Sequence, residues 1–491
     1  MKTLLVNPSS KYINSHKLYR QFLPPIAPLG LAYIAAVLEA NKFDVDIIDM
    51  YADRISGNEL LKIIKDRKPQ LIGFSVLTSV IDDVRCLVSE IRSVDKETKI
   101  VLGNTHASFF ADSLLKEGLA DIIVRGEGEY SMLDICKSLD SGGCLSEVRG
   151  ISYRKNGDII HNAAPVPVAD IDALPSPAFH LLDLNKYKEF PLLSVSNARF
   201  LPISGSRGCN YRCYFCSQDS INKEVRYRKI GHVIDEIEYM QKRFNVEYFC
   251  FTDACFPFSE KSGLEFCDDL MRRGLHKKIK WITETRVDMV SKKLLKKMKD
   301  AGLHLIIYGI EVGNQEILDK IGKKASLDDA RLALKHTKEN GILSLGLFML
   351  GLPWETESSC NDTIKFAREL DADIVKFNIA IPFPGSQFYK DYIGQGQIKH
   401  PEIYSSWYDS FNMGSGENFS FNNNLTYKDL VRLQKKAMIS YYARPKIFLR
   451  SCLKRIITVK NILYGAYWLL FMFFSNCLIN FSRKKKHPYE P

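Results

Sequence analysis

The amino-acid sequence predicts an α/β protein in which two parallel β-sheets follow one another along 491 residues. Two observations support this class. Apolar strand-like runs alternate with helical stretches over about the first 140 residues, and a second alternation begins near Leu201. Five strands in the first series predict a flavodoxin-like (Rossmann-type) domain, and six in the second predict a partial (β/α)6 barrel of the TIM type.

In the first predicted sheet, each strand ends in small or polar residues. These strands are Thr3–Val6, Val45–Asp49, Leu71–Val76, Ile100–Gly103 and Ile122–Arg125. Leu29–Ala40 is predicted to be a helix, because its apolar residues recur at helical spacing. The carboxyl ends of parallel strands meet at one edge of such a sheet, where ligands bind. We therefore expect a binding crevice at that edge.

A β-hairpin and a linker separate the two predicted sheets. Asn156-Gly157, between Gly150–Arg154 and Asp158–Ile160, is a typical hairpin turn. Four prolines between residues 165 and 177 then discourage regular structure, because proline lacks a backbone N–H.

The second predicted sheet is also parallel, with helical stretches between its strands. The strands are Leu201–Gly205, Tyr248–Thr252, Ile279–Glu284, Leu303–Gly309, Ser344–Leu350 and Ile374–Ala380. Catalytic residues are expected at their carboxyl ends. The predicted domains are residues 1–145 (α/β domain), 146–195 (hairpin and proline-rich linker), 196–390 (partial barrel), 391–445 (irregular or helical extension) and 446–491 (helical tail, basic and apolar).

The positive charge of the chain is concentrated near its C-terminus. The net charge is +11, and the residues from Tyr441 onward contain ten Lys and Arg against Glu490 alone, so they carry +9 of it. The remainder is nearly neutral, which argues against a nucleic-acid-binding surface. Twelve cysteines are too sparse for a disulfide scaffold, and Met1–Val6 is typical of a buried strand rather than a secretory signal. We expect a cytoplasmic protein.

The tail contains an apolar segment without charged residues from Asn461 to Ser482. About twenty such residues can span a bilayer, and flanking aromatic and basic residues suit a membrane interface. Residues 444–460 interleave basic and apolar side chains, a pattern that suits anionic lipid. The alternative is a terminal helix packed on the body of the protein. We favour contact with the inner face of the membrane through residues 446–486, and leave open whether the segment spans it.

Three cysteines, Cys209, Cys213 and Cys216, lie on one loop just after the first predicted barrel strand. Thiolates favour zinc, Cu(I) or iron–sulfur centres. A structural zinc site needs a fourth ligand and usually a second Cys-x-x-Cys pair, which Cys250 and Cys255 do not form. Three ligands on a compact loop favour a 4Fe–4S cluster with one open iron. The alternatives are a zinc loop or three buried cysteines.

The spacing Cys-x3-Cys-x2-Cys in this position resembles that of the radical S-adenosylmethionine (SAM) superfamily. The flavodoxin-like domain in front resembles the cobalamin-binding domain of the class B methyltransferases and the anaerobic magnesium-protoporphyrin ester cyclases. The resemblance covers about residues 1–390. It implies three cofactors: a 4Fe–4S cluster bound by the three cysteines, SAM, and cobalamin. It also implies that the cluster cleaves SAM to form a radical.

The resemblance assigns five residues to SAM. Phe215 would lie against the adenine, and Asp253 near the methionine amino group. Glu284 and Arg286 would contact the nucleoside and the carboxylate, and Glu311 would make a further polar contact. In the crevice that binds SAM, a carboxylate or a guanidinium could bind one of the charged groups of SAM. The alternative for each charged residue is that it is only solvated at the end of a strand.

The resemblance assigns a second set of residues to cobalamin, in the opening loop and at the strand ends of the first sheet. They are Pro28, Gly30, Ser75, Thr78, Gly103, His106, Gly126 and Glu127. Small residues and backbone N–H groups suit a flat corrin ring. The Asp-x-His-x-x-Gly motif of other cobalamin proteins is absent, and His106 is better interpreted as a loop residue than as a cobalt ligand. The alternative is a domain that only caps the barrel.

The implied function is that of a cobalamin-dependent methyltransferase. It would act on an unactivated carbon of a small-molecule or lipid substrate, with an electron donor such as a ferredoxin or flavodoxin. The alternatives are an oxidative cyclase or another radical rearrangement enzyme, and a non-catalytic cobalamin or redox sensor. A tRNA methylthiotransferase would need further cluster cysteines in the first domain, where Cys86, Cys136 and Cys144 are scattered.

Overall fold

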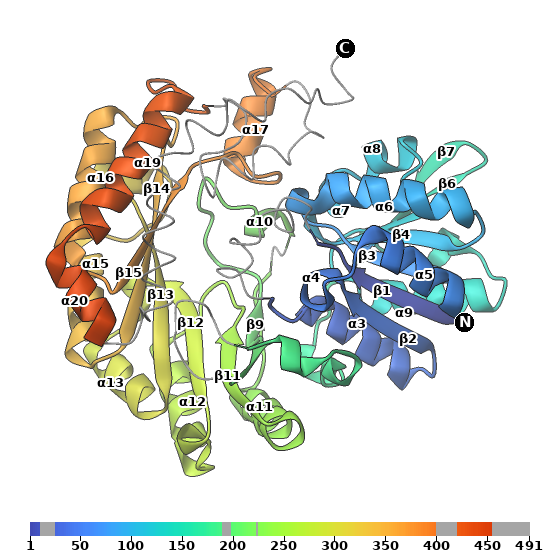
Figure 1. The fold of residues 1–491 in the computed structure, drawn as a ribbon, viewed down its shortest axis with the longest axis horizontal. Helices are drawn as coiled ribbons and strands as arrows, with labels where there is room; N and C mark the ends of the chain where they lie inside the picture. The colour runs from blue at the N-terminus through green and yellow to red at the C-terminus, as the bar shows by residue number, and fades with distance from the viewer. Residues whose placement is uncertain (10–24, 189–197, 222–223, 399–419, 454–491) are drawn as a thin grey trace.

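The computed structural model describes residues 1–9, 25–188, 198–221, 224–398 and 420–453. Two sheets with their covering helices form an N-terminal domain and a larger C-terminal domain, which lie side by side (Figure 1). Both sheets are built mainly from parallel strands. The predicted α/β class is therefore confirmed.

The first sheet has seven strands among the described residues, in the order β2-β1-β3-β4-β5-β6-β7. They are β1 (Lys2–Asn7), β2 (Asp44–Asp49), β3 (Leu71–Ser75), β4 (Lys99–Gly103), β5 (Ile122–Val124), β6 (Ile151–Lys155) and β7 (Asp158–His161). β1 to β5 are parallel, and β6 and β7 form the predicted hairpin at one edge. The order 2-1-3-4-5 is that of flavodoxin-like folds, as predicted.

Helices cover both faces of this sheet. On one face α3 (Leu29–Ala40) packs with α9 (Glu129–Asp140), and the other face carries α5 (Gly57–Arg67) and α6 (Ile81–Val94). The helix α3 has the predicted bounds. It is buried around most of its circumference, because it lies between this sheet and the second domain.

The second sheet has six parallel strands in the described part of the chain, in the order β15-β14-β13-β12-β11-β8. They are β8 (Arg199–Ile203), β11 (Val246–Phe251), β12 (Lys280–Arg286), β13 (Leu303–Glu311), β14 (Leu343–Leu350) and β15 (Ile374–Ile379). Its outer face is covered by α11 (Ile230–Phe244), α12 (Glu260–Arg272), α13 (Lys292–Asp300), α15 (Leu327–Glu339) and α16 (Glu357–Leu370). Within the described residues β8 and β15 do not pair, so the sheet is an open partial barrel, as predicted.

The basic start of the tail is bound to the barrel. The helices after β15 in the described residues are α17 (Gln387–Gly394), α19 (Tyr427–Tyr442) and α20 (Pro445–Leu453). Arg450 of α20 pairs with Asp371 at 2.9 Å and with Asp373 at 3.3 Å, and Lys446 pairs with Asp371 at 2.9 Å. The prediction that these basic residues lie on lipid is therefore not supported, because aspartates of the barrel bind them.

The apolar segment at 461–482, like the rest of residues 454–491, lies outside the described residues. In the part of the chain that the structure describes, no helix has both the length and the apolar character needed to cross a bilayer. The predicted membrane contact through residues 446–486 thus gains no support from residues 446–453.

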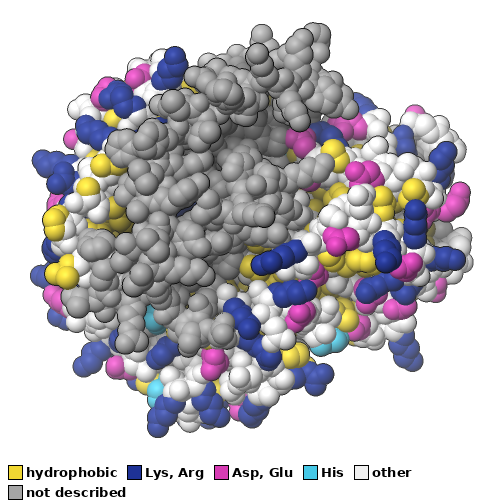
Figure 2. Space-filling view, in the orientation of Figure 1, with side chains coloured by type: hydrophobic (Ala, Val, Ile, Leu, Met, Phe, Trp, Pro, Cys, Tyr) yellow, Lys and Arg dark blue, Asp and Glu magenta, His cyan; other side chains and the backbone are white. Residues whose placement is uncertain are grey.

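Charged side chains of both signs are interspersed over the described part of the face in Figure 2. Elsewhere too, basic residues are paired with acidic ones, as Arg67 is with Asp46 and Arg85 with Glu117. A nucleic-acid-binding surface would instead gather Lys and Arg into one patch or stripe. The face in Figure 2 therefore agrees with the nearly neutral charge of the chain before its tail.

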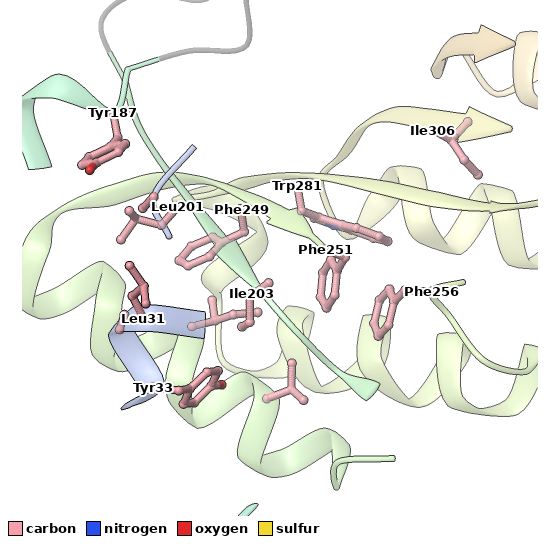
Figure 3. Packing of buried hydrophobic residues seen from close by; sticks show 14 of the residues in the cluster. Leu31, Tyr33, Tyr187, Leu201, Ile203, Phe249, Phe251, Phe256, Trp281 and Ile306 are labelled. Atoms are coloured by element: carbon pink, nitrogen blue, oxygen red, sulfur yellow. The ribbon is translucent and has the colours of Figure 1, made fainter. Parts of the chain in front are cut away.

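The two domains share one hydrophobic core. Figure 3 shows Leu31 and Tyr33 of α3 beside Leu201 and Ile203 of β8, and all four are buried. The Tyr33 hydroxyl also donates a hydrogen bond to Glu236 of α11 at 3.5 Å. The N-terminal domain is therefore fixed to the barrel by apolar packing together with polar contacts.

Ion pairs cross the same domain boundary. Arg226, in β10 (Arg226–Tyr227), donates to both carboxylate oxygens of Glu127, at 2.6 and 2.9 Å, and each side chain is nearly buried. Glu127 also accepts a hydrogen bond from the backbone N–H of Val168 in the linker, while Arg207 pairs with Glu129 at 2.6 Å. Glu127 is thus engaged by protein groups, and its assignment to cobalamin stays a prediction.

Replacing Arg226 with Lys is expected to lower the free energy of unfolding by about 1–3 kcal/mol, because an ammonium cannot make the two parallel hydrogen bonds to the nearly buried Glu127. Urea-induced unfolding measures the change. The control is Arg432→Lys, whose two hydrogen bonds to Glu357, both 2.9 Å, are exposed. The control should lose less than about 1 kcal/mol. Equal losses in the two variants would contradict this account.

Candidate active site

The cysteine loop is closed at its base by a short antiparallel pair, β9 (Ser206–Arg207) and β10. Gly208 begins the loop with a φ of +94°, and a Cβ there would lie 2.7 Å from the carbonyl oxygen of Glu224. Glycine is required, because the backbone is left-handed and another backbone segment lies close to it. The loop therefore returns to its starting point, which confines the three cysteines near the carboxyl end of β8.

The middle of the loop packs against later segments of its own domain. The backbone of Tyr214 donates to the carbonyl of Ile321 and accepts from the N–H of Phe388, both at 3.0 Å. Its ring is stacked on that of Phe388, with centroids 5.3 Å apart, and lies 4.7 Å from the ring of Trp354. Phe215 packs, half-buried, against the same apolar cluster. Its contact with adenine stays a prediction.

The thiols of the three loop cysteines are half-buried. Burial raises the pKa of Cys213 to about 11, and it also raises the pKa of Cys216. Cys209 differs, because a hydrogen bond with the thiol of Cys255 lowers its pKa to about 6. Among the described residues, no three His, Cys, Asp or Glu lie close enough together to hold a single metal ion. Binding of a cluster by the three cysteines therefore stays a prediction.

A buried lysine lies beside these thiols. Lys323 is only 6% exposed, and its Nζ lies 2.7 Å from Oε1 of Glu311. Burial lowers the pKa of Lys323, but attraction to Glu311 and Cys213 outweighs that effect, so the pKa is raised and the ammonium keeps its charge. Glu311 ends β13 with a φ of +73°, a conformation that side chains rarely adopt. The ion pair helps to hold it there.

Arg286, at the end of β12, is a second buried cation. Its guanidinium donates to the two carboxylate oxygens of Asp288, at 2.9 and 2.8 Å, and to the backbone carbonyl of Lys323. It also lies 3.6 Å above the ring of Tyr211 in the cysteine loop. One nitrogen, Nη1, is buried without a hydrogen-bond partner. A buried donor of this kind usually has an acceptor, which a bound anionic group would provide.

The surroundings of the thiols fit an anionic cluster. Lys323 and Arg286 both favour the thiolate forms of Cys209 and Cys213. Buried anions need such charges nearby, because the protein interior solvates them poorly. Arg286 could be predicted from the sequence, but Lys323 could not, since Lys323-Lys324 after a short helix is typical of a solvated surface. No spacing rule relates that dipeptide to the cysteines.

Two predicted SAM residues differ in how far their carboxylates are already engaged. Asp253 accepts hydrogen bonds from the N–H of Gly205 at 3.0 Å and from the hydroxyl of Ser206 at 2.5 Å, and burial raises its pKa to about 6. Glu284 is exposed and lies on the same face of β12 as Ile282, which is the inner face of the half-barrel. Desolvation and the charge of Glu311 raise the pKa of Glu284 to about 7. Asp253 mainly fixes the entry to the cysteine loop, whereas Glu284 can bind a ligand.

Several predicted cobalamin residues gather at the carboxyl ends of the strands in the first sheet. Their polar contacts are Ser75 Oγ with Asn104 Nδ2 at 2.9 Å, Thr78 Oγ1 with His106 Nδ1 at 3.3 Å, and the Gly126 N–H with Ser108 Oγ at 3.1 Å. Gly103 lies at the end of β4, Pro28 directly precedes α3, and Gly30 has open space beside its Cα. The strand-end residues thus share one edge of the sheet, but their binding of cobalamin stays a prediction.

His106 is buried under the loops at this edge. Its ring lies 4.7 Å from that of Phe110, and burial lowers its pKa to about 4. The ring is therefore neutral near pH 7, and its Nε2 is buried without a partner. The prediction that His106 is a loop residue is wrong, because it lies in the helix α7 (Asn104–Phe109). Its assignment to cobalamin stays a prediction.

The strand-end edge of the first sheet meets the barrel and the cysteine loop. A Cβ on Gly385, in the loop after β15, would lie 2.3 Å from the ring of Phe109 in α7 (Asn104–Phe109). Ser220, in α10 (Gln218–Ile221), follows the last loop cysteine and donates to the Gly385 carbonyl at 2.5 Å. Figure 1 shows α7 and α10 between the two domains. The predicted cobalamin edge and the predicted cluster loop therefore meet in one region.

A buried carboxyl shapes the loop that carries Trp354. Glu355 is fully buried and accepts hydrogen bonds from the backbone N–H groups of Gly351 at 2.7 Å and Leu352 at 2.9 Å. Burial raises its pKa from the ordinary 4.5 to about 7, although these hydrogen bonds oppose the change. Between these two values the folded chain binds more protons than the unfolded chain, so stability falls as pH rises.

Replacing Glu355 with Gln is therefore expected to reduce this pH dependence. Gln can still accept the two backbone hydrogen bonds but does not ionise. Between about pH 5 and pH 8, the wild type should lose roughly 2–3 kcal/mol of unfolding free energy relative to the variant. Urea unfolding at the two pH values measures the difference. Parallel pH profiles for the two proteins would contradict the assigned shift.

A flavodoxin-like domain whose strand ends meet a half-barrel with a Cys-x3-Cys-x2-Cys loop defines a class, the radical SAM enzymes with an N-terminal cobalamin domain. Residues 18–135 match the B12 binding domain family, and residues 203–367 match the Radical SAM superfamily. An uncharacterized methyltransferase of Pyrococcus horikoshii, PH0819, is 30% identical over 427 residues, which cover 86% of this chain and 89% of that protein. The chain therefore belongs to the B12-binding branch of the radical SAM superfamily. It is an enzyme of that family, whose cofactors are a 4Fe–4S cluster, SAM and cobalamin.

Two further similarities extend the comparison. The anaerobic magnesium-protoporphyrin IX monomethyl ester cyclase of Rubrivivax gelatinosus is 30% identical, with 80% of this chain and 70% of the cyclase covered. The radical SAM methyltransferase TsrM of Kitasatospora setae, solved with cobalamin and a [4Fe-4S] cluster, superposes with a TM-score of 0.66 at 19% identity, covering 80% of this chain and 75% of TsrM. The similarity to TsrM supports the fold of both domains as one arrangement.

Proposed function

We propose that the chain is a cobalamin-dependent radical methyltransferase that acts on an unactivated carbon of a small-molecule substrate. The observation that supports this most strongly is the meeting of the first sheet's strand ends, the cysteine loop and the loop after β15 around Gly385. A methyl donor held on one domain and a radical generated on the other must reach the same carbon, and this arrangement brings the two domains' binding edges together.

The site residues have distinct roles in this proposal. Cys209, Cys213 and Cys216 would hold the cluster, while Lys323 and Arg286 offset its negative charge. Glu284 would bind a polar group of SAM from the inner face of the half-barrel. When bound, the cluster supplies the electron that cleaves SAM, and cobalamin carries the methyl group. The protein would hold the reactants in place and exclude water.

The inner face of the half-barrel is apolar near the amino ends of its strands. Opposite the helix-covered side, it carries mainly apolar residues, which are Ala198, Phe200, Tyr248, Ile282, Leu305, Leu345 and Ile374. A lipid substrate was suggested by the predicted membrane contact of the tail. That contact is not supported, because the described part of the tail is paired with the barrel. The reductant would be a small electron carrier of the ferredoxin or flavodoxin type.

Product counting tests the proposal against its main alternative, an oxidative cyclase, which the 30% identity to the Rubrivivax gelatinosus enzyme favours next. Anaerobically reconstituted full-length protein is incubated with cobalamin, SAM, dithionite and a small-molecule extract of anaerobic cells. A methyltransferase should form S-adenosylhomocysteine and 5′-deoxyadenosine in equal amounts. 5′-Deoxyadenosine alone would favour a cyclase or another rearrangement. Neither product, with cobalamin bound, would favour a sensor.

A further inference from the structure

A cavity of about 470 Å³ lies in the N-terminal domain, toward the β7 edge of the first sheet. It is bounded by α7, by α8 (Ala111–Lys116) and by the carboxyl ends of β5 and β7, and Figure 1 shows α8 beside β7. Pockets that bind small molecules commonly have this size. The rings and charged groups of its wall belong to Phe109, Phe110, Asp112, Lys116, Arg125 and His161.

Arg125, directly after β5, is held in place and keeps an unused donor. Its Nη2 donates to the backbone carbonyls of Ile151 at 3.1 Å and Asn162 at 2.6 Å. Its Nε is buried and has no hydrogen-bond partner. A buried donor without an acceptor costs free energy, which an anion bound beside the guanidinium would recover.

The imidazole of His161 is oriented through both of its nitrogens. Nδ1 lies 2.8 Å from Oγ of the buried Ser152, and Nε2 lies 3.0 Å from a carboxylate oxygen of Asp112. Lys116 is exposed on α8, one turn after Asp112. With Lys116 and Arg125, the wall carries two permanent positive charges against the one negative charge of Asp112. The cavity is therefore suited to an anion.

The cavity lies on the β5 side of α7, whereas several predicted cobalamin residues lie on its β3 side. His106 Nδ1 is 3.3 Å from Oγ1 of Thr78, which follows β3, while Ser108 Oγ accepts from the N–H of Gly126, which follows β5. Residues two positions apart on a helix do not face the same neighbour. Ser108 lines the cavity and His106 does not. An occupant of the cavity is thus separated by α7 from the contacts of His106.

We propose that this cavity binds an organic anion, a phosphate or carboxylate carried on a small apolar or aromatic group, and that it does so independently of cobalamin. Lys116 and Arg125 attract the anionic group, and the rings of Phe109 and Phe110 pack against the organic part. Asp112 opposes binding by repulsion. The inference goes beyond the proposed methyl transfer and requires neither the cluster nor SAM.

Isothermal titration calorimetry of the full-length protein with phenyl phosphate tests the site. We expect saturable binding of one molecule per chain, weakened by added salt because salt screens the attraction. Inorganic phosphate, which lacks the ring, should bind several-fold more weakly. Lys116→Gln should weaken binding of phenyl phosphate roughly three- to fivefold, and Asp112→Asn should strengthen it by a similar factor. The matched control is Lys65→Gln, an exposed lysine on α5 outside the cavity, which should leave the affinity unchanged.

Absence of saturable binding would overturn the site, as would equal affinities in Lys116→Gln, Asp112→Asn and Lys65→Gln. The titration is carried out on the chain with and without bound cobalamin. Equal affinities in the two states support an independent site, whereas competition would overturn that independence and assign the cavity to cobalamin. SAM cleavage plays no part in these measurements, so failure of this inference can be distinguished from failure of the proposed function.

Discussion

Replacing Cys213 with Ala is expected to abolish both the visible absorbance of the cluster and the cleavage of SAM. Two remaining loop thiolates cannot hold three irons, and a cluster with an incomplete ligand set is lost. Anaerobic reconstitution followed by absorbance spectroscopy, iron analysis and 5′-deoxyadenosine assay measures the effect. Activity should fall to background while the fold is retained, because Cys213 is only half-buried.

The control for this prediction is Cys144→Ala. Cys144 is exposed in the N-terminal domain, away from the cysteine loop, so its replacement should leave iron content and SAM cleavage unchanged. A Cys213→Ala protein that keeps the cubane absorbance would contradict the assignment of the cluster. Zinc in the reconstituted wild type would contradict it as well, and would favour the zinc-loop alternative.

Replacing Lys323 with Met is expected to give the largest stability loss, about 3–5 kcal/mol of unfolding free energy in the cluster-free protein. The variant leaves the Glu311 carboxylate buried without its partner at 2.7 Å. It also removes one of the two cations beside the thiols, so cluster content after reconstitution should fall. Urea unfolding of the cluster-free chain and iron analysis of the reconstituted chain measure the two effects separately.

Two variants show whether the effect belongs to the buried pair. Lys320→Met, three positions earlier, removes an exposed pair with Glu316 and should lose less than about 1 kcal/mol. Lys323→Met combined with Glu311→Gln removes both charges and should recover much of the lost stability. If Lys323→Met resembles Lys320→Met, the ion pair does not stabilise the site in the way argued above.

The architecture could be predicted closely from the sequence, because buried parallel strands are continuous apolar runs. Ile374–Ala380 was predicted where β15 covers Ile374–Ile379, and the predicted helix Leu29–Ala40 matches α3. The short pair β9 and β10 was missed, since two-residue strands carry no periodicity. The start of the tail was ambiguous, because interleaved basic and apolar residues suit both a lipid surface and a protein surface that bears aspartates.

The site could be predicted only in part. The cysteine spacing identifies the loop, but the partners of the loop come from distant segments. Lys323 follows the helix after β13, pairs with Glu311, and stands in no recognisable local pattern. The ion pair of Glu127 with Arg226 across the domain boundary could not be predicted either, because the two residues lie far apart along the chain. Sequence reasoning finds residues that are close along the chain, whereas charge compensation and contact between loops arise from tertiary structure.

The shared packing of α3 and β8 bears on how this protein can be divided. Leu31 and Tyr33 pack against Leu201 and Ile203. Cutting the chain in its proline-rich linker and separating the two halves would therefore expose an apolar face on each half. Neither fragment could shield that face alone, and each would tend to aggregate or to bind the other again. The two halves are therefore expected to fold as one unit, and replacing one half with that of a distant relative would require matched changes where α3 and β8 pack together.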